Sequence, residues 1–474
     1  MTKALVYFVS LAFMMVSCNS GNNDSTSRPN IIIILADDLG YNDISCFGST
    51  LIQTPNLDVL ASEGMILTDF HSNCSVCSPT RVALMTGRYQ HRYGIVNVLG
   101  QTSMALPLIQ GLPNESVTIA EVLKENGYQT AMFGKSHLGN FKKFHPLDFG
   151  FDYFFGVTAG MIGHPFAYTY SVPGPNSKSM LYRNREWLDG PGKYFTYRLA
   201  DEVVEYIDNR NKEQPFFIYL PFTAPHVPYW KPEDSLTVWD GNPLGPHPDD
   251  VESAYKSTIE ALDLAVGNIM DKIRESGLSD NTMVFFTSDN GPVKEESSKP
   301  FTGRKSGLYE GGTRVPGIAW WPGKIKPGQI NNELIVTMDI FPTLTSLAGI
   351  MLDETLNLDG IDFSNVLLKN GGLPQRRVFW EKPAGVYMDH FDVRREAVRQ
   401  GNWKLLRDRS GEELKLFNLD TDTAEQFDIS ATYPEKVQEM YSAFLAWRQE
   451  VYSEAPMTLD DMVKYLEETG VIKE

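Results

Sequence analysis

Mainly apolar runs alternate with amphipathic segments along most of the chain. The apolar runs, which predict buried strands, occupy residues 31–35, 128–133, 216–220 and 283–287. Helices are predicted between them, where capping residues and glycines bracket the amphipathic segments 54–64, 118–127 and 253–275. Strands that are apolar on both faces and alternate with helices predict an α/β fold, in which a large, mainly parallel sheet is flanked by helices on both faces.

The pattern changes near Pro374. Residues 396–407 and 414–419 predict antiparallel strands separated by turns, and a helix is expected over about 434–452. We therefore expect a large domain over residues 28–373 and a small C-terminal α+β domain over residues 374–474, with a short antiparallel sheet and a helix. In the small domain, Trp403 is expected to pack in the core, and Lys404 is a candidate for contact with a substrate.

The N-terminus predicts export. Lys3 precedes an apolar run over residues 4–16, which is too short to span a membrane. Residues 1–18 are therefore expected to be a signal peptide, and the polar residues 19–27 a tether. Val16-Ser17-Cys18 resembles a bacterial lipoprotein cleavage site, so Cys18 is expected to carry lipid and to be the only contact with a membrane, in a periplasmic or outer-membrane-anchored protein. Simple cleavage and secretion is the alternative.

Composition narrows the range of partners. The chain has 474 residues, 42% of them hydrophobic, which is enough for a sizeable core, and its formal net charge is −18. Because no basic block is present to contact phosphates, the sequence argues against a nucleic-acid partner. An anionic small substrate remains compatible with this charge, because salt screens exposed charges beyond about 8 Å.

Chemically versatile residues follow each of the four predicted strands. They are Asp37 and Asp38, then Lys135 and His137, then His226, and finally Asp289 and Asn290. Each alone would be assigned to a cap, loop or turn, but the carboxyl ends of parallel strands meet in one crevice, where these residues are expected to converge. The three aspartates and the asparagine offer only oxygen ligands, which suits Ca²⁺ or Mg²⁺ rather than zinc. Lys305, in a glycine-rich loop, adds a cation.

The segment from Cys77 to Arg88 predicts a short helix with a reactive residue at its start. Ser78 is a favourable N-cap, Pro79 suits the first helical position, and Gly87 suits a left-handed end. Cys77 would then face the positive end of the helix, which binds anions and lowers the pKa of a thiol. Arg81, about one turn further on, would add a planar fork for an oxyanion.

These motifs carry a family resemblance. Cys-x-Pro-x-Arg followed by Thr86-Gly87-Arg88 resembles the signature of the type I, formylglycine-dependent sulfatases of the alkaline-phosphatase superfamily, particularly exported bacterial carbohydrate sulfatases. Four further family motifs occur with it: the Asp37-Asp38 pair, Gly-Lys-x-His-Leu-Gly from Gly134, Ala-Pro-His ending at His226, and Asp-Asn-Gly from Asp289. Lys305 lies four residues before the family's Tyr-Glu-Gly-Gly run, and Ser136 replaces the usual tryptophan.

The resemblance implies the site and its cofactors. Cys77 would be oxidised to formylglycine by a maturation enzyme, and a divalent metal, Ca²⁺ with Mg²⁺ as the alternative, would bind Asp37, Asp38, Cys77, Asp289 and Asn290. The catalytic residues would be Cys77, Arg81, Lys135, His137, His226 and Lys305. Arg81 and Lys135 would steady the aldehyde hydrate, His137 would help expel sulfate, and His226 with Lys305 would bind sulfate and assist protonation of the leaving alcohol.

The implied activity is hydrolysis of a sulfate ester in a carbohydrate, such as a glycosaminoglycan or another sulfated glycan. Candidates for sugar contacts are His91, Arg92, His164 and Arg304. A phosphomonoester or phosphonate hydrolase of the same superfamily and a non-catalytic sulfoglycan-binding lipoprotein are the alternatives, and a two-zinc phosphatase is disfavoured because no histidine-rich ligand set is present. With Cys18 and Cys77 assigned, Cys46 and Cys74 form either one disulfide or two buried thiols.

Overall fold

The computed structural model describes residues 28–100, 105–106, 108–139, 142–170, 178–234, 240–383, 394–407 and 413–471. The expected signal peptide with Cys18 and the expected tether lie outside the described residues, so lipidation and export stay predictions. Within the described ranges, no helix is both long enough and apolar enough to cross a membrane.

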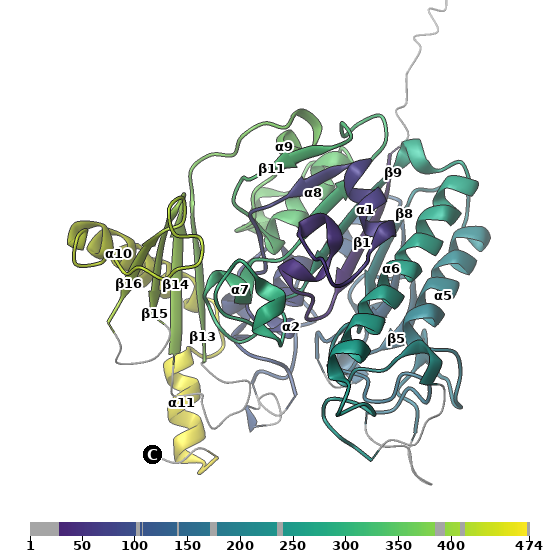
Figure 1. Cartoon of the computed structure of the whole chain (residues 1–474), viewed down its shortest axis with the longest axis horizontal. Coiled ribbons are helices and arrows are strands. Elements are labelled where there is room, and N and C mark those ends of the chain that lie inside the picture. Colours follow the sequence, from purple (N-terminus) through teal and green to yellow (C-terminus); the bar gives the residue numbers. More distant parts are fainter. Residues whose placement is uncertain are drawn as a thin grey trace, which may run out of the picture.

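A ten-stranded mixed sheet forms the centre of the molecule (Figure 1). In spatial order its strands are β11 (Gln329–Asn331), β2 (Met65–Leu67), β10 (Gly317–Trp320), β9 (Thr282–Ser288), β1 (Asn30–Ala36), β8 (Phe216–Pro221), β4 (Gln129–Lys135), β5 (Tyr153–Val157), β6 (Tyr182–Arg183) and β7 (Glu186–Trp187). Strands β9, β1, β8, β4 and β5 pair in parallel, whereas β10, β6 and β7 pair antiparallel to their neighbours. The predicted α/β class and mainly parallel sheet are confirmed.

The central sheet is buried on both faces. In β1, Ile31 and Ile33 belong to one hydrophobic core, and Ile32 and Ile34 belong to the other. The first core is covered by α2 (Cys77–Thr86), α4 (Ile119–Glu125), α8 (Ile340–Leu347) and α9 (Ser364–Lys369). The second core is covered by α1 (Pro55–Ser62), α5 (Phe195–Asn209) and α6 (Val251–Glu275). This burial explains why the central strands are mainly apolar rather than alternately polar and apolar.

The C-terminal part forms a second sheet. Its four antiparallel strands are β13 (Arg377–Pro383), β14 (Arg394–Gln400), β15 (Trp403–Arg407) and β16 (Lys415–Asn418), followed by α10 (Pro434–Tyr452) and α11 (Leu459–Glu468). The antiparallel sheet and α10 are confirmed, whereas α11 was not predicted. Trp380 of β13 and Phe341 of α8 belong to one core, so the sheet packs directly against the main body (Figure 1). The boundary at residues 373 and 374 stays a prediction.

Two smaller elements connect these parts. Strands β3 (Phe70–His71) and β12 (Ile335–Val336) form a two-stranded parallel sheet, and α7 (Glu310–Thr313) follows the glycine-rich loop. Cys46, Cys74 and Cys77 are free, so no disulfide joins Cys46 and Cys74 in the described chain.

Candidate functional site

The carboxyl ends of the central strands bring the sequence-predicted residues together. Asp37 follows β1 directly, Asp289 follows β9 directly, and Cys77 is the first residue of α2. One ligand atom from each of these three residues lies within 4.8 Å of the other two. Lys135 is the last residue of β4 rather than a loop residue after it. The crevice predicted from the strand ends is therefore present.

The start of α2 differs from the prediction. The N-cap is Val76, Cys77 is the first helical residue, and Ser78 lies inside the helix. The Oγ of Ser78 instead accepts a hydrogen bond of 2.9 Å from the backbone N–H of Leu99. A long-range partner has thus replaced the expected local cap. Gly87 ends the helix at a φ of 66°, as predicted.

Each aspartate of the site is paired with a cation. Lys135 Nζ lies 2.7 Å from Asp37 Oδ2, and Lys305 Nζ lies 2.7 Å from Asp38 Oδ1. The guanidinium of Arg81 donates two hydrogen bonds, of 2.9 and 2.6 Å, to Asp289 Oδ2 and a third, of 2.8 Å, to the Lys135 carbonyl. Arg81 and Lys135 are fully buried. Three negative and three positive side chains therefore balance one another in a buried crevice.

Burial and charge act differently on the titrating groups of the site. Burial raises the pKa of Asp37 to about 7, although Lys135 lowers it. Burial also opposes ionisation of Asp38, but Lys305 and His226 hold its pKa well below the usual range. Burial raises the pKa of the Cys77 thiol despite nearby lysines, so the expectation of a thiol activated by the helix end is wrong.

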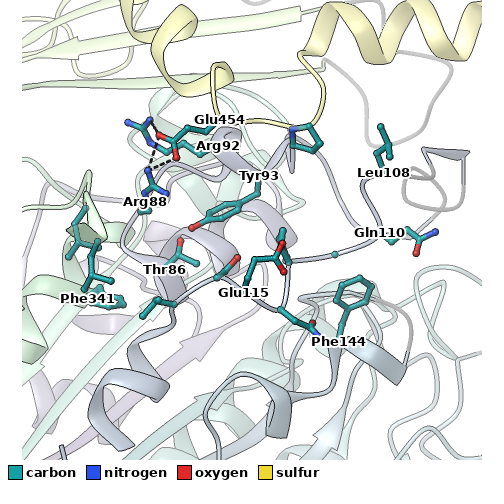
Figure 2. A pocket seen from close by; sticks show the side chains of 18 of the residues that line it. Thr86, Arg88, Arg92, Tyr93, Leu108, Gln110, Glu115, Phe144, Phe341 and Glu454 are labelled. Carbon is teal, nitrogen blue, oxygen red and sulfur yellow. Dashed lines mark hydrogen bonds and ion pairs between the residues drawn. The ribbon is translucent and has the colours of Figure 1, made fainter. Parts of the chain in front are cut away.

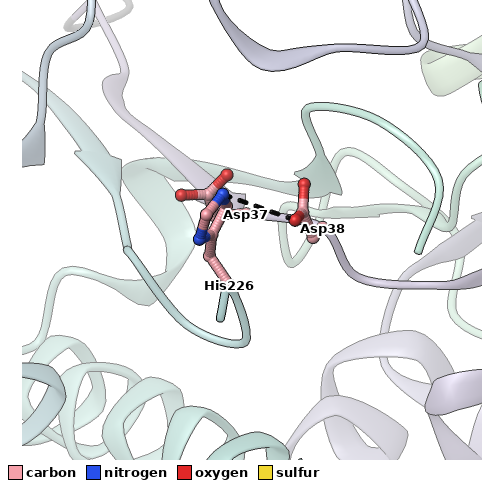
Figure 3. Close-up of side chains that lie close together, drawn as sticks. All are labelled: Asp37, Asp38 and His226. Carbon is pink, nitrogen blue, oxygen red and sulfur yellow. Dashed lines mark ion pairs between the residues drawn. The ribbon is translucent and has the colours of Figure 1, made fainter. Parts of the chain in front are cut away.

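The two histidines flank the aspartates from different segments. His226 Nε2 lies 3.6 Å from Asp38 Oδ2, as the dashed line in Figure 3 marks. His137 Nε2 lies 2.9 Å from the Leu99 carbonyl, while its buried Nδ1 has no hydrogen-bond partner within the described ranges. Burial lowers the pKa of both histidines, to about 3 for His226. Both imidazoles are therefore neutral and open to proton transfer.

The oxygen atoms of the site fit a hard divalent cation. Asp37 Oδ1 and Asn290 Oδ1 are buried and make no hydrogen bond to the rest of the described chain. Asn290 Nδ2 donates a 2.7 Å hydrogen bond to Asp38 Oδ1, which ties the amide to the carboxylates. Buried polar atoms without partners are costly unless something else satisfies them. An ion that prefers oxygen, such as Ca²⁺ or Mg²⁺, would satisfy them.

Sequence reasoning missed two basic residues beside this site. Lys382, near the end of β13, and Arg395 of β14 both donate to the carbonyl of Ser306, next to Lys305. The only sequence signal was a lysine before a proline at the end of the apolar run 378–380. No local pattern shows that this strand lies against the catalytic loop.

Most of the candidate substrate contacts outside the crevice have interior partners instead. His91 Nε2 lies 2.8 Å from the Glu381 carbonyl, and Arg92 Nη2 lies 2.6 Å from Asp359 Oδ1. His164 is buried against the ring of Trp230. Lys404 is also buried, with Glu310 and Glu425 as partners, and Trp403 is half-buried against the core, while Arg304 is exposed.

A cavity of about 800 Å³ opens at the other end of α2. Figure 2 shows Arg88 and Arg92 paired with Glu454 at its rim, with Tyr93 between them and Glu115. Because the ten residues of α2 span about 15 Å, this cavity is separate from the crevice at Cys77.

Comparison with known proteins identifies relatives of the chain. A family model described as sulfatase matches residues 29–350, and a model described as N-sulphoglucosamine sulphohydrolase, C-terminal, matches residues 303–450. Arylsulfatase G of Rattus norvegicus is 32% identical over 477 residues, covering 90% of this chain and 88% of the relative. N-acetylgalactosamine-6-sulfatase of Homo sapiens is 32% identical over 383 residues, covering 76% of this chain and 69% of the relative.

Solved structures have the same fold. The crystal structure of Ps i-CgsB in complex with k-i-k-neocarrahexaose superposes with a TM-score of 0.77 at 28% identity, covering 89% of this chain and 93% of that one. The PsFucS1 sulfatase from Pseudoalteromonas sp. superposes with a TM-score of 0.73 at 25% identity, covering 91% of this chain and 92% of that one.

Proposed function

Because the chain belongs to the sulfatase family and is a sulfuric ester hydrolase, we propose that it removes sulfate from a sulfated carbohydrate, with formylglycine formed from Cys77 and a divalent metal ion. The observation that carries this proposal is the convergence of Asp37 and Asp289 on Cys77, with Asp38 held beside Asp289 by its backbone N–H. A relative named for a sulfated amino sugar and a similar structure solved with neocarrahexaose support a carbohydrate substrate.

The crevice contains lysine side chains and candidate metal ligands that together would neutralise the negative charge of a sulfate ester. When present, the hydrated aldehyde supplies a nucleophilic hydroxyl, and the metal ion neutralises charge on the sulfate oxygens. Asp37, Asp38, Asp289 and Asn290 would hold the ion. Lys135 lies at Asp37 and Lys305 at Asp38, and both would bind the anionic oxygens of the ester.

Proton transfers are assigned to the remaining side chains. His137, with a buried and unpaired Nδ1, would take the proton whose removal restores the aldehyde and releases sulfate. His226 and Lys305, both beside Asp38, would bind the sulfate. With His226 neutral, the ammonium group of Lys305 would donate the proton that the oxygen of the leaving alcohol takes up. Arg81 would orient the Cys77 side chain through its position one turn along α2.

The proposed maturation has a structural requirement. Every residue from Cys77 to Thr86 is buried, so a maturation enzyme would have to reach the Cys77 segment before folding is complete. Mass spectrometry of the Cys77 peptide from the native host tests this step. An unmodified thiol in fully active protein would rule out the formylglycine mechanism.

Replacement of the precursor residue tests the reaction itself. Cys77→Ala should lower kcat by at least about a thousandfold on a sulfated monosaccharide, because no aldehyde can form, while the melting temperature stays within a few degrees of that of the wild type. The matched control is Cys46→Ala, which changes a cysteine outside the crevice. Faster turnover of a matched aryl phosphate than of the aryl sulfate would favour a phosphate ester hydrolase instead.

Desulfation of a panel of defined sulfated mono- and disaccharides, analysed by the position of the lost sulfate, would identify the substrate. The carbohydrate part of the proposal fails if only simple aryl sulfates are hydrolysed.

A further inference from the structure

The backbone of Ser306 is held between the segment that bears Cys77 and the C-terminal sheet. Its N–H donates a 2.8 Å hydrogen bond to the carbonyl of Ser75, two residues before Cys77. Its carbonyl accepts hydrogen bonds from Lys382 Nζ, at 3.4 Å, and from Arg395 Nη1. Ser306 adopts a φ of 72°, a left-handed conformation that a serine keeps only when its surroundings impose it. This junction therefore fixes the loop at the residue after Lys305.

Lys382 is an unusual residue to find at such a junction. Its side chain is 0% exposed, and lysine is among the residues least often fully buried. Removing an ammonium group from water costs several kcal/mol, which the polar groups around it must offset. Lys382 also donates to the carbonyl of Pro383, and its charge acts on the nearby Cys74 thiol. The ammonium thus lies between the loop of Lys305 and the segment leading to Cys77.

The strand that carries Lys382 is itself fixed against the nucleophile segment. Trp380 Nε1 donates a 2.9 Å hydrogen bond to the carbonyl of Ser72, and the N–H of Phe379 donates to the hydroxyl of Tyr89 at 3.2 Å. Strand β13 therefore contacts the chain on both sides of Cys77. A rigid strand that holds both partners sets the distance between them.

The backbone of the Lys305 loop is also tied to the segment that carries Asp289. The N–H of Lys305 donates a 2.8 Å hydrogen bond to the carbonyl of Pro292, which ties the loop to the segment after Asp289. Glycines let the loop fold closely on itself, since a Cβ built at Gly312 would lie 2.0 Å from the Gly307 carbonyl oxygen. Contacts from Ser75 and from the C-terminal sheet then fix where this compact loop lies, with Lys305 Nζ beside Asp38.

We infer that Lys382, assisted by Arg395, is a positioning residue that holds the Ser306 carbonyl and so keeps Lys305 aligned with the sulfate ester. This inference rests on the proposed function, in which Lys305 binds sulfate and assists departure of the alcohol. The C-terminal sheet then completes the active site, because it supplies two of the contacts that orient a catalytic lysine.

The test compares leaving groups on the matured, full-length enzyme. As the S–O bond breaks, the ester oxygen keeps the electron pair and takes up a proton, and a weakly acidic alcohol needs that proton more. Lys382→Met keeps the length and apolar stem of the side chain but loses the donor. It should lower kcat about ten- to a hundredfold on phenyl sulfate and clearly less on 4-nitrophenyl sulfate. Lys305→Ala should show the same dependence on the leaving group.

A double variant separates positioning from a general loss of stability. If Lys382 acts through Lys305, Lys305→Ala combined with Lys382→Met should be no slower than Lys305→Ala alone. Lys382→Arg, which restores a donor, should recover part of the rate. Lys464→Met, at a lysine of α11 whose side chain is 75% exposed, is the matched control and should leave both rates unchanged.

Distinct outcomes contradict the inference and the proposed function. The positioning role of Lys382 would be rejected if the rate loss of the double variant equalled the product of the losses of the two single variants. It would also be rejected if Lys382→Met lowered kcat equally on phenyl sulfate and 4-nitrophenyl sulfate. If Lys382→Met does not fold, Arg395→Met at the half-buried second donor takes its place in the same comparison. If Lys305→Ala is slow but both donor variants behave as the wild type, only the positioning role fails. If the wild type hydrolyses no sulfate ester, or Lys305→Ala retains full activity, the proposed function fails first.

Discussion

At the level of single residues, the side chains of the crevice neutralise one another even without a metal ion. Asp37, Asp38 and Asp289 are paired with Lys135, Lys305 and Arg81. A divalent cation adds two positive charges to this neutral set, so the crevice attracts an anion although the whole chain carries a formal net charge of −18. The local arrangement outweighs the net charge because distant exposed carboxylates are screened.

Metal binding should therefore be visible in stability. Adding Ca²⁺ to protein treated with a chelator should raise its stability by about 2.7 kcal/mol at a concentration a hundred times the Kd, measured as an increase in melting temperature. Asn290→Ala removes a neutral oxygen ligand and should reduce this increase. Asp353→Asn, at an acid that only caps a surface turn, is the control. The same increase in the wild type and Asn290→Ala would contradict the ligand assignment.

Among helices and strands, close packing at the carboxyl ends fixes where the catalytic side chains point. Gly134 in β4 precedes Lys135 and has a φ of 122°, and a Cβ built there would lie 1.9 Å from the carbonyl oxygen of Pro221 in β8. This close approach explains why glycine precedes the lysine in the Gly-Lys-x-His-Leu-Gly motif. Only glycine lets β4 approach β8 closely enough for Lys135 to reach Asp37.

Gly134→Ala should consequently damage both stability and activity. Displacement of β4 together with backbone strain should cost at least about 2 kcal/mol in the free energy of unfolding, measured by urea denaturation. Turnover should fall with it as Lys135 is displaced. The control is Gly127→Ala, where φ is 86° but nothing lies within 4 Å of the added Cβ, so only about 1 kcal/mol of strain is expected. Equal losses in the two variants would argue against the strand contact.

Across the whole molecule, a buried ionic network joins the main body to the C-terminal sheet. Glu310 of α7 is paired with Arg399 of β14 and Lys404 of β15, at 3.0 and 2.9 Å. The rest of the network consists of Asp69, His71, Arg314 and Glu425. Asp69, His71 and Glu310 lie close enough together to hold a metal ion, but three cations already neutralise the carboxylates. We therefore assign this network to the junction between the sheets.

The junction should make stability depend on pH. Burial raises the pKa of Glu425 to about 7 from an ordinary value of 4.5, with Lys404 opposing and Glu310 reinforcing the change. The folded chain thus holds this proton more tightly than the unfolded chain, so the contribution of Glu425 is full below about pH 4.5 and is lost as the pH rises through about 7. Glu425→Gln should flatten this decline in melting temperatures recorded from pH 5 to 8. Parallel curves for variant and wild type would contradict it.

Much of the fold was predictable because its signals are local. Burial on both faces requires mainly apolar runs, as in residues 31–35, and a capping box such as that of Thr118 with Glu121 spans only four residues. The shorter strands β5 and β10 escaped prediction because their four or five residues are ambiguous without their neighbours.

Local pattern was sufficient to place Asp37, Asp38 and Asp289 at one edge of the sheet, because parallel strands necessarily end on the same side. It could not show that Ser78 bonds Leu99 rather than capping its helix, that burial raises the pKa of the Cys77 thiol, or that Lys382 contacts the loop of Lys305. Those outcomes depend on which distant segments come into contact and how much water they exclude. Sequence spacing does not encode these quantities, and only the tertiary packing of the chain sets them.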